Sequence, residues 1–289
     1  MIIAVVGPTG VGKTKMSVEL AKIFNAEIIN SDSTQVFRRI NIGTAKVSEE
    51  EMDGVVHHLI DIKDLDEEYS VYDYQLDART YIDKILKNGK NVIIAGGSNM
   101  YLSALLYDYK FNKEDNVYDL DSLSNDEMYA ELKKLNLNLD IDRKNRQRLI
   151  RYYAKYVNNS EPLEVNGSNL IYDVKFVGLT TNREILHTRI NKRVELMIES
   201  GLIPEVRELY NEYRDSKQLH NTIGYKEIIK YINGCDLETA ITEIKQNSRN
   251  YAKRQYTWLN NKMDIKWFEV DFNNFNATVK QVEEYIQKN

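Results

Sequence analysis

The stretch Gly7-Pro8-Thr9-Gly10-Val11-Gly12-Lys13-Thr14 decides the fold, because it matches the phosphate-binding pattern G-x-x-x-x-G-K-[ST]. An apolar run at residues 2–6 precedes it, which is typical of a buried parallel strand, and residues 14–24 follow with apolar side chains near helical spacing. Between a strand and a helix, the glycines let backbone N–H groups point inward, and the helix N-terminus favours an anion. Lys13 supplies a positive charge to phosphate oxygens, and Thr14 a hydroxyl to Mg²⁺. The motif predicts a diphosphate or polyphosphate site and leaves open which compound binds.

The rest of the chain predicts an α/β fold, with the parallel sheet core of the P-loop NTPase class. Further strands are expected at 27–30, 59–62, 91–97, 174–179 and 264–268, and helices at 72–86, 183–200, 204–213, 225–232 and 237–260. Residues 108–170 break this alternation, since they are rich in Tyr, Asn, Asp, Leu and Lys and lack apolar strand runs. We therefore expect a core domain at 1–107 and 171–289, with helices in its C-terminal region, and a helical insertion domain at 108–170.

Composition limits the class of protein. The formal net charge of −5 means that any binding to nucleic acid must depend on local basic patches. Cys235 is the single cysteine, which excludes an intramolecular disulfide and indicates a reducing compartment. No apolar stretch approaches the ~20 residues of a membrane span, and residues 2–6 are too short for a signal peptide. We expect a cytoplasmic monomer without a membrane partner.

Two polar clusters follow predicted strands, where the carboxyl ends of a parallel sheet face a ligand. Asp32, in Asn30-Ser31-Asp32-Ser33-Thr34-Gln35, is expected near the phosphate loop, as a general base or metal-shell ligand. An N-cap role for Asp32 is equally compatible with its position. Gly96-Gly97-Ser98 ends another strand at the same edge, where glycines permit close backbone approach and Ser98 offers a hydroxyl; the alternative is a simple helix start.

Blocks spread over the whole chain resemble the bacterial tRNA dimethylallyltransferases, also called tRNA isopentenyltransferases. Beyond the phosphate loop and the two clusters above, the resemblance rests on the following runs, which occur in the family's order: Val36-Phe37, Asn41-Ile42-Gly43-Thr44-Ala45-Lys46, His57-His58-Leu59-Ile60-Asp61, Tyr69-Ser70-Val71, Arg189-Ile190, Arg193-Val194, Gly201-Leu202, Ile223-Gly224-Tyr225-Lys226-Glu227 and Tyr251-Ala252-Lys253-Arg254-Gln255-Tyr256-Thr257-Trp258-Leu259. Such a distributed set is far more specific than any single motif.

The resemblance implies transfer of a dimethylallyl group from dimethylallyl diphosphate to N6 of adenosine-37, next to the anticodon of tRNA. Diphosphate is then the leaving group, and the phosphate loop with Lys13, Arg193 and a Thr14-bound Mg²⁺ would stabilise its charge. Asp32 would accept the proton of the exocyclic amine. Ser98 is carried over as a third catalytic residue beside Asp32 and Lys13. Without the resemblance, Arg193 would be read as a surface arginine of a helix.

The resemblance also implies contacts with the tRNA anticodon stem-loop. It assigns them to Asp32, Ser33, Thr34, Gln35 and Ser98, to the block Gln147, Arg148, Leu149, Ile150 and Arg151, and to Lys253 and Arg254. Aromatic and arginine side chains near these positions suit RNA loops, whose bases can be unstacked. For the basic run at 143–151, a solvated helix face is the simpler alternative, and Trp258 is expected to pack on the core.

The chain departs from the family pattern at two places. Ser98 stands where the family has threonine, which keeps the hydroxyl and loses a methyl group. The insertion is shorter, and Leu139-Asp140-Ile141-Asp142 replaces the family's H-P-N-D run. His57 and His58 are not read as a zinc site, because neighbouring residues in a strand point to opposite faces.

Two other classes of protein share some of these features. A P-loop kinase of small molecules fits the phosphate loop and Asp32 equally well, but needs neither the Gly43-Thr44-Ala45-Lys46 block nor the basic stretches. An RNA-binding protein without activity would have no use for intact Lys13, Thr14 and Asp32.

Overall fold

The computed structural model describes residues 1–110, 123–134, 142–146, 149–150, 152–153 and 169–288. The chain divides into two compact units, residues 1–108 with 169–289 and residues 109–168. Within the described ranges no helix is long and apolar enough to cross a membrane.

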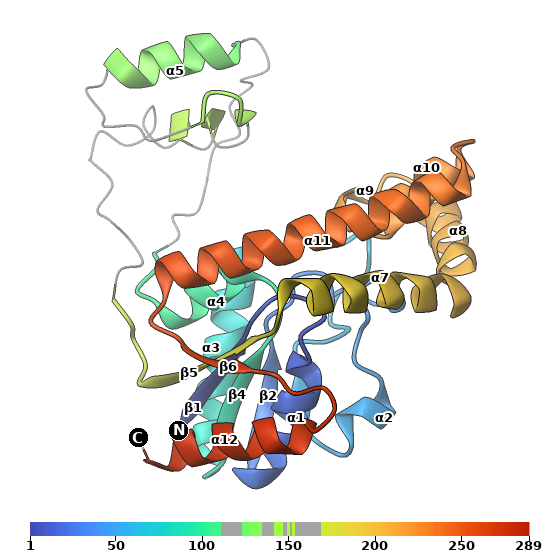
Figure 1. Ribbon diagram of the computed structural model, residues 1–289. Helices are drawn as coiled ribbons and strands as arrows, with labels where there is room; N and C mark the ends of the chain where they lie inside the picture. The colour runs from blue at the N-terminus through green and yellow to red at the C-terminus, as the bar shows by residue number, and fades with distance from the viewer. Residues whose placement is uncertain (111–122, 135–141, 147–148, 151, 154–168, 289) are drawn as a thin grey trace. The chain divides into compact units, whose positions relative to one another are not determined.

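The larger unit is built on a six-stranded parallel sheet with strand order β3-β2-β4-β1-β5-β6 (Figure 1). Its strands are β1 (Ile2–Val6), β2 (Ala26–Asn30), β3 (His57–His58), β4 (Asn91–Ala95), β5 (Val174–Thr180) and β6 (Lys266–Glu269). The P-loop-type α/β fold expected from the sequence is confirmed. One expected strand is wrong: residues 59–62 do not continue β3, because Leu59 (φ 62°) and Asp61 (φ 54°) adopt left-handed backbone conformations that end the strand.

The larger unit also contains helices, some on the two faces of the sheet and others beyond it (Figure 1). They are α1 (Lys13–Ile23), α2 (Glu49–Met52), α3 (Val71–Lys87), α4 (Asn99–Leu106), α7 (Arg183–Glu199), α8 (Leu202–Glu212), α9 (Lys217–Asn221), α10 (Tyr225–Ile232), α11 (Leu237–Lys262) and α12 (Phe275–Lys288). α12 was not expected from the sequence. The long α11 runs beside α7, as Figure 1 shows.

The hydrophobic core has two layers because strand side chains alternate between faces. Ile3 and Val5 of β1 face the layer that α1 and α12 complete, whereas Ile2 and Ala4 face the layer that includes α3, α4 and the α7–α11 helices. Every β1 residue is buried, as the uninterrupted apolar run predicts. This packing places the carboxyl ends of β1, β2 and β4 together at one edge.

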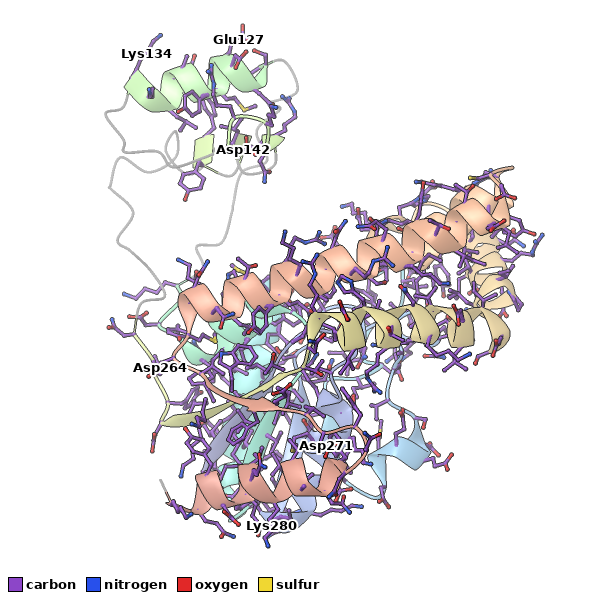
Figure 2. All side chains as sticks on the ribbon, viewed as in Figure 1. Glu127, Lys134, Asp142, Asp264, Asp271 and Lys280 are labelled. Carbon is purple, nitrogen blue, oxygen red and sulfur yellow. The ribbon has the colours of Figure 1, made fainter. Side chains whose placement is uncertain are left out.

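The smaller unit contains α5 (Asn125–Lys134), on which Glu127 and Lys134 are labelled in Figure 2. Met128 and Leu132 of this helix form a small core with Leu149, and all three side chains are buried. Arg143 pairs with Asp126 at 3.0 Å. The predicted tRNA-binding role of this unit stays a prediction.

Ile93 tests how much the central sheet contributes to stability. Its side chain is fully buried in the middle of β4, opposite Ile3 and Ile28. We expect Ile93→Ala to lower the free energy of unfolding by about 2–5 kcal/mol, because the removed atoms leave a cavity. Urea unfolding measures this, with Ile23→Ala on exposed α1 surface as the matched control, which should cost less than about 1 kcal/mol. Equal losses in the two variants would contradict the packing described.

Candidate active site

The phosphate loop requires glycine because its backbone lies in regions that other residues avoid. Gly7, Gly10 and Gly12 have φ values of 144°, 85° and 99°. A Cβ atom on Gly7 would lie 2.5 Å from the Leu179 carbonyl oxygen of β5. The loop therefore rests directly on the end of β5, and its conformation depends on the sheet.

Lys13, the first residue of α1, folds back over this loop. Its Nζ donates hydrogen bonds to the carbonyl oxygens of Gly7 and Pro8, each at 3.0 Å. Burial lowers the pKa of Lys13 to about 8; the positive charge of Arg193 acts in the same direction, and Asp32 opposes both. An anion placed beside Nζ would favour the charged form, so the ammonium group suits a phosphate ligand.

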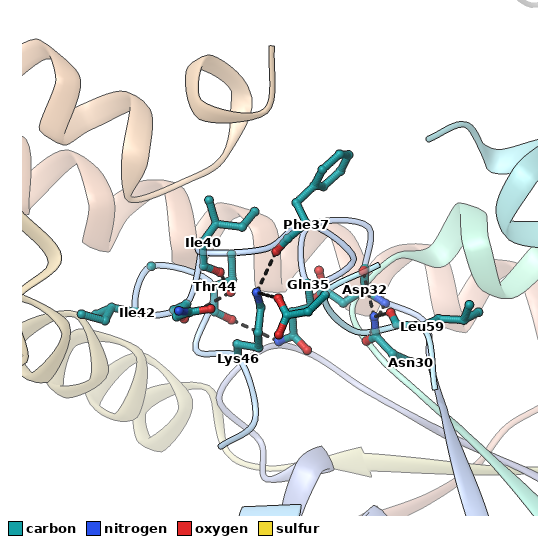
Figure 3. A network of polar contacts seen from close by, with 12 residues as sticks. Asn30, Asp32, Gln35, Phe37, Ile40, Ile42, Thr44, Lys46 and Leu59 are labelled. Carbon is teal, nitrogen blue, oxygen red and sulfur yellow. Dashed lines mark hydrogen bonds and ion pairs between the residues drawn. The ribbon is translucent and has the colours of Figure 1, made fainter. Parts of the chain in front are cut away.

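Asp32 lies directly after β2, and local hydrogen bonds orient its carboxylate (Figure 3). Thr34 donates to Asp32 Oδ1 through its backbone N–H at 3.0 Å and through its hydroxyl at 2.7 Å. The second oxygen, Oδ2, faces Gly97, where an added Cβ would approach it to 2.9 Å. Thus the carboxylate does cap a local turn, yet one oxygen is directed at the sheet edge, so both roles left open by the sequence are compatible with the structure.

Gln255 joins the phosphate loop to the Gly96–Gly97 turn, a role that sequence reasoning missed. This buried side chain of α11 accepts a hydrogen bond from Thr9 N–H at 2.9 Å and donates to the Gly97 carbonyl at 2.9 Å. Tyr251, one helical turn earlier, donates its hydroxyl to the same carbonyl at 2.7 Å. One signal in the sequence could have found this role. Gln255 is a polar residue four positions after Tyr251, on a helix face that is otherwise packed.

Arg193 connects the phosphate loop to the 41–46 segment. One guanidinium nitrogen donates to Thr9 Oγ1 at 2.8 Å and the other to the Thr44 carbonyl at 3.3 Å. The segment itself is held by Glu205, which accepts from Ile42 N–H at 3.1 Å and from the buried Tyr225 hydroxyl at 2.5 Å. Arg193 is therefore oriented toward the site and is not an ordinary surface arginine.

Two neighbouring cavities meet at these residues. The phosphate cavity, of about 320 Å³, is lined by the loop residues Gly10, Gly12, Lys13 and Thr14 and by Asp32, Gln35 and Glu51 among others. The adjoining cavity, of about 470 Å³, is lined by Ser33, Thr34, Ile190, Val194, Met197, Ile223, Ile244, Arg254 and others. Both cavities share Thr9, Asp32, Thr44, Arg193 and Tyr251 as lining residues. A phosphate group and a second reactant could thus reach Asp32 from two sides.

Ser98 is not brought into either cavity. It is the N-cap of α4, where its Oγ accepts from Tyr101 N–H at 3.4 Å, and its own N–H donates to the Ser31 carbonyl at 2.9 Å. The helix-start alternative weighed for this turn therefore matches the local geometry. A direct catalytic role for Ser98 stays a prediction.

The predicted tRNA residues on α11 lie on different faces of that helix. Arg254 lines the adjoining cavity, whereas Lys253 lines a third cavity of about 580 Å³ together with Arg183, His187 and Arg249. Both side chains are exposed, so both are available to a polyanion.

The predicted tRNA block in the smaller unit is only partly described. Gln147, Arg148 and Arg151 lie outside the described residues. Leu149 is fully buried in that unit's core, where it packs with Met128 and Leu132, and its assignment as a tRNA contact stays a prediction. Ile150 is partly buried and packs against the same core.

The two histidines that were not read as a zinc site have other partners. His58 Nε2 contacts Glu27 at 2.6 Å, and His57 Nδ1 contacts the Val55 carbonyl at 2.9 Å. In the described part of the chain, no group of three or more His, Cys, Asp or Glu side chains is placed to hold a metal ion.

The Gln255 bridge can be tested with an isosteric change. Gln255→Glu keeps an acceptor for Thr9 N–H but turns an oxygen toward the Gly97 carbonyl, which leaves two acceptors facing each other. We expect the free energy of unfolding to fall by about 1–3 kcal/mol and the affinity for inorganic pyrophosphate to fall with it. Chemical denaturation and calorimetry measure the two effects, with exposed Gln281→Glu as the control. Unchanged stability and affinity would show that the bridge is dispensable.

Comparisons with known proteins agree with this arrangement. The family model described as IPP transferase matches residues 35–262. A relative named tRNA dimethylallyltransferase, from Anoxybacillus flavithermus, is 43% identical over 99% of this chain and 96% of its own. The crystal structure of a tRNA isopentenylpyrophosphate transferase from Bacillus halodurans has a TM-score of 0.78 at 38% identity, covering 99% of this chain and 95% of that one.

A eukaryotic dimethylallyltransferase described as acting on tRNA has a TM-score of 0.85 at 28% identity, covering 99% of this chain and 79% of its own. The matched residues 35–262 include Arg193, Gln255 and most of the lining of both cavities. The similarity thus extends over the site as well as the sheet, and the chain belongs to the IPP transferase family.

Proposed function

We propose that this enzyme transfers a dimethylallyl group from dimethylallyl diphosphate to N6 of adenosine-37 in tRNA. The observation that carries the proposal is the position of Asp32, whose carboxylate lies in the wall shared by the phosphate cavity and the adjoining cavity. A phosphate loop alone would suit a kinase equally well. The family match and the second cavity favour prenyl transfer over that alternative.

The phosphate cavity suits diphosphate as a leaving group. Lys13 Nζ and the Arg193 guanidinium carry positive charge beside the inward-facing loop, at the N-terminus of α1. As the C–O bond of the donor breaks, negative charge grows on the diphosphate and these groups stabilise it. Apolar side chains of α7 in the adjoining cavity, Ile190, Val194 and Met197, would contact the dimethylallyl group.

Oxygen donors near the loop fit Mg²⁺, which binds through hydroxyls, carboxylates, phosphates and water. The Thr14 hydroxyl and the Asp32 carboxylate line the same cavity, and Glu51 adds another carboxylate. We propose Thr14 as the residue that would hold the ion. When bound, Mg²⁺ would supply further positive charge to the diphosphate.

Asp32 is the proposed general base. The new bond forms between N6 and the first carbon of the dimethylallyl group while the C–O bond to diphosphate breaks. The amine then has a surplus proton, which Asp32 accepts through Oδ2, the oxygen that Thr34 does not engage. Lys13 assists as a charge-stabilising group. We propose Ser98 as a further catalytic residue; by capping α4 and donating to the Ser31 carbonyl it also holds the Gly96–Gly97 turn.

The tRNA anticodon stem-loop would approach from the adjoining cavity. Ser33, Thr34 and Arg254 line that cavity, Gln35 lines the phosphate cavity, and Lys253 is exposed on the neighbouring face of α11. We propose that the target base enters there and that these residues contact the loop, with the 147–151 block contributing from the smaller unit. We further propose that the enzyme acts as a cytoplasmic monomer.

The proposal is tested by incubating purified protein and Mg²⁺ with unmodified tRNA and radiolabelled dimethylallyl diphosphate. Label should appear on the tRNA. Parallel incubations with labelled ATP and either tRNA or small nucleosides test the kinase alternative. Absence of label from the prenyl donor, or transfer from ATP, would overturn the proposal.

Asp32→Asn isolates the general base, because the amide keeps the size of the side chain and cannot take the proton. We expect kcat to fall by about 10²- to 10⁴-fold, while the Kd for tRNA changes little. Single-turnover kinetics and filter binding measure the two quantities. Exposed Asp66→Asn is the matched control. A kcat near that of the wild type would exclude Asp32 as the base.

The pKa of Lys13 predicts a pH dependence of diphosphate binding. The ammonium form attracts the anion, so affinity is present below the pKa of about 8 and is lost as pH rises through it; bound anion moves the transition upward. Calorimetry with inorganic pyrophosphate on both sides of this pH measures the change. Lys13→Met removes the titrating amine. The pH dependence of pyrophosphate affinity that remains in this variant comes from the titration of pyrophosphate itself. Identical profiles in the two proteins would contradict the prediction.

A further inference from the structure

The segment after β6 contacts the outer side of the phosphate loop through an aromatic ring. The Arg189 guanidinium lies 3.8 Å from the centre of the Phe272 ring, a short cation–π contact. Arg189 Nε donates a hydrogen bond to the Gly10 carbonyl at 3.0 Å, and the same side chain lines the phosphate cavity. Phe272 therefore contacts the phosphate loop indirectly, because it packs on Arg189 of α7, which is hydrogen-bonded to the loop.

A second ring from this segment touches the loop where α1 begins. A Cβ atom on Gly12 would lie 3.0 Å from Phe275 Cε2, so the ring packs directly against the glycine. Lys15 Nζ lies 4.8 Å from the centre of the same ring. Phe275 is the first residue of α12 and is buried.

Local hydrogen bonds fix the turn that carries both rings. Asp271, labelled in Figure 2, accepts from the N–H groups of Asn273 at 2.9 Å and Asn274 at 3.1 Å. Its own N–H donates to Thr278 Oγ1 at 3.1 Å, and Thr278 is buried. The turn is thus tied to α12, which packs on α1.

These contacts bear on affinity because a glycine-rich loop loses much conformational entropy when it is ordered. Groups that hold the loop in its binding shape before the ligand arrives reduce that cost at the moment of binding. Ile190 supports the same loop from α7, since a Cβ on Gly10 would lie 3.2 Å from its Cγ1. The loop is therefore contacted from α7 and from the C-terminal segment, and Arg189 stacked on Phe272 joins the two.

We propose that Phe272 and Phe275 are positioning residues that hold the phosphate loop in its diphosphate-binding shape, Phe272 by orienting Arg189 and Phe275 by packing on Gly12. The inference rests on the proposed function only in naming the prenyl diphosphate as the ligand. Neither ring touches the reacting atoms, so their effect is expected on diphosphate affinity and on the KM for the donor, with little effect on the KM for tRNA.

Phe272→Leu tests the role of the ring face, because leucine keeps apolar bulk and removes the cation–π contact. We expect the Kd for inorganic pyrophosphate and the KM for dimethylallyl diphosphate to rise by about 2- to 30-fold, the range of such a contact. Phe272→Tyr keeps the ring face and should restore wild-type values. Phe268→Leu changes a buried ring of β6 that packs on Tyr285, and it controls for general loss of packing.

A double-mutant cycle shows whether Phe272 acts through Arg189. Arg189→Met should weaken pyrophosphate binding, and adding Phe272→Leu should then cost much less than it does in the wild type. Additive losses, or a Phe272→Leu variant with wild-type pyrophosphate affinity, would overturn the proposal. So would an equal rise in Kd for Phe268→Leu. Pyrophosphate binding is measured without prenyl transfer, so a protein that binds normally but transfers nothing would contradict the proposed function alone.

Discussion

The close approach of two backbones, at Ser31 after β2 and Gly96 after β4, is the constraint on which the site depends. A Cβ on Gly96 would lie 2.1 Å from the Ser31 carbonyl carbon, so only glycine allows the two strand ends to meet. Ser31 N–H donates to the Ala95 carbonyl at 2.8 Å, so the hydrogen-bond ladder between β2 and β4 continues one residue beyond β2. The carboxylate of Asp32 consequently lies against Gly97. Gln255 then joins Gly97 to the phosphate loop by hydrogen bonds. As a result, Asp32, the Gly96–Gly97 turn and the phosphate loop all lie at one edge of the sheet.

Features that depend on local pattern were predictable from the sequence. The phosphate loop, β1 and β4 follow from glycine spacing and apolar runs, and Asp32 follows from the rule that parallel strands end at a common edge. The extent of α11 was also close to the prediction, since its apolar residues recur at helical spacing. Arg193 was found only through the family resemblance, because one arginine on a helix carries no sign of the direction in which it points.

Features that depend on tertiary contacts were missed or misjudged. Gln255 is marked in the sequence only as a polar residue on a packed helix face, and that signal does not tell which distant backbone groups meet at its amide. α12 was overlooked although its buried residues, Val279, Val282 and Ile286, have helical spacing. The strand expected at 59–62 was wrong because Leu59 and Asp61 adopt left-handed backbone conformations, which the apolar pattern of this stretch does not reveal. The burial of Leu149 beside Met128 and Leu132 likewise could not be read from its basic neighbours in the sequence.

The hydroxyl of Ser98 caps α4, and the backbone N–H of Ser98 donates to the Ser31 carbonyl. These two contacts limit which residues can replace Ser98. A cap needs an oxygen on Cβ and is nearly indifferent to an additional methyl group, so serine and threonine serve it almost equally well. Ser98→Thr would therefore keep the cap of α4 without a compensating change elsewhere. Alanine would destabilise the start of α4, because it has no oxygen to accept a hydrogen bond from the backbone N–H groups of the first turn.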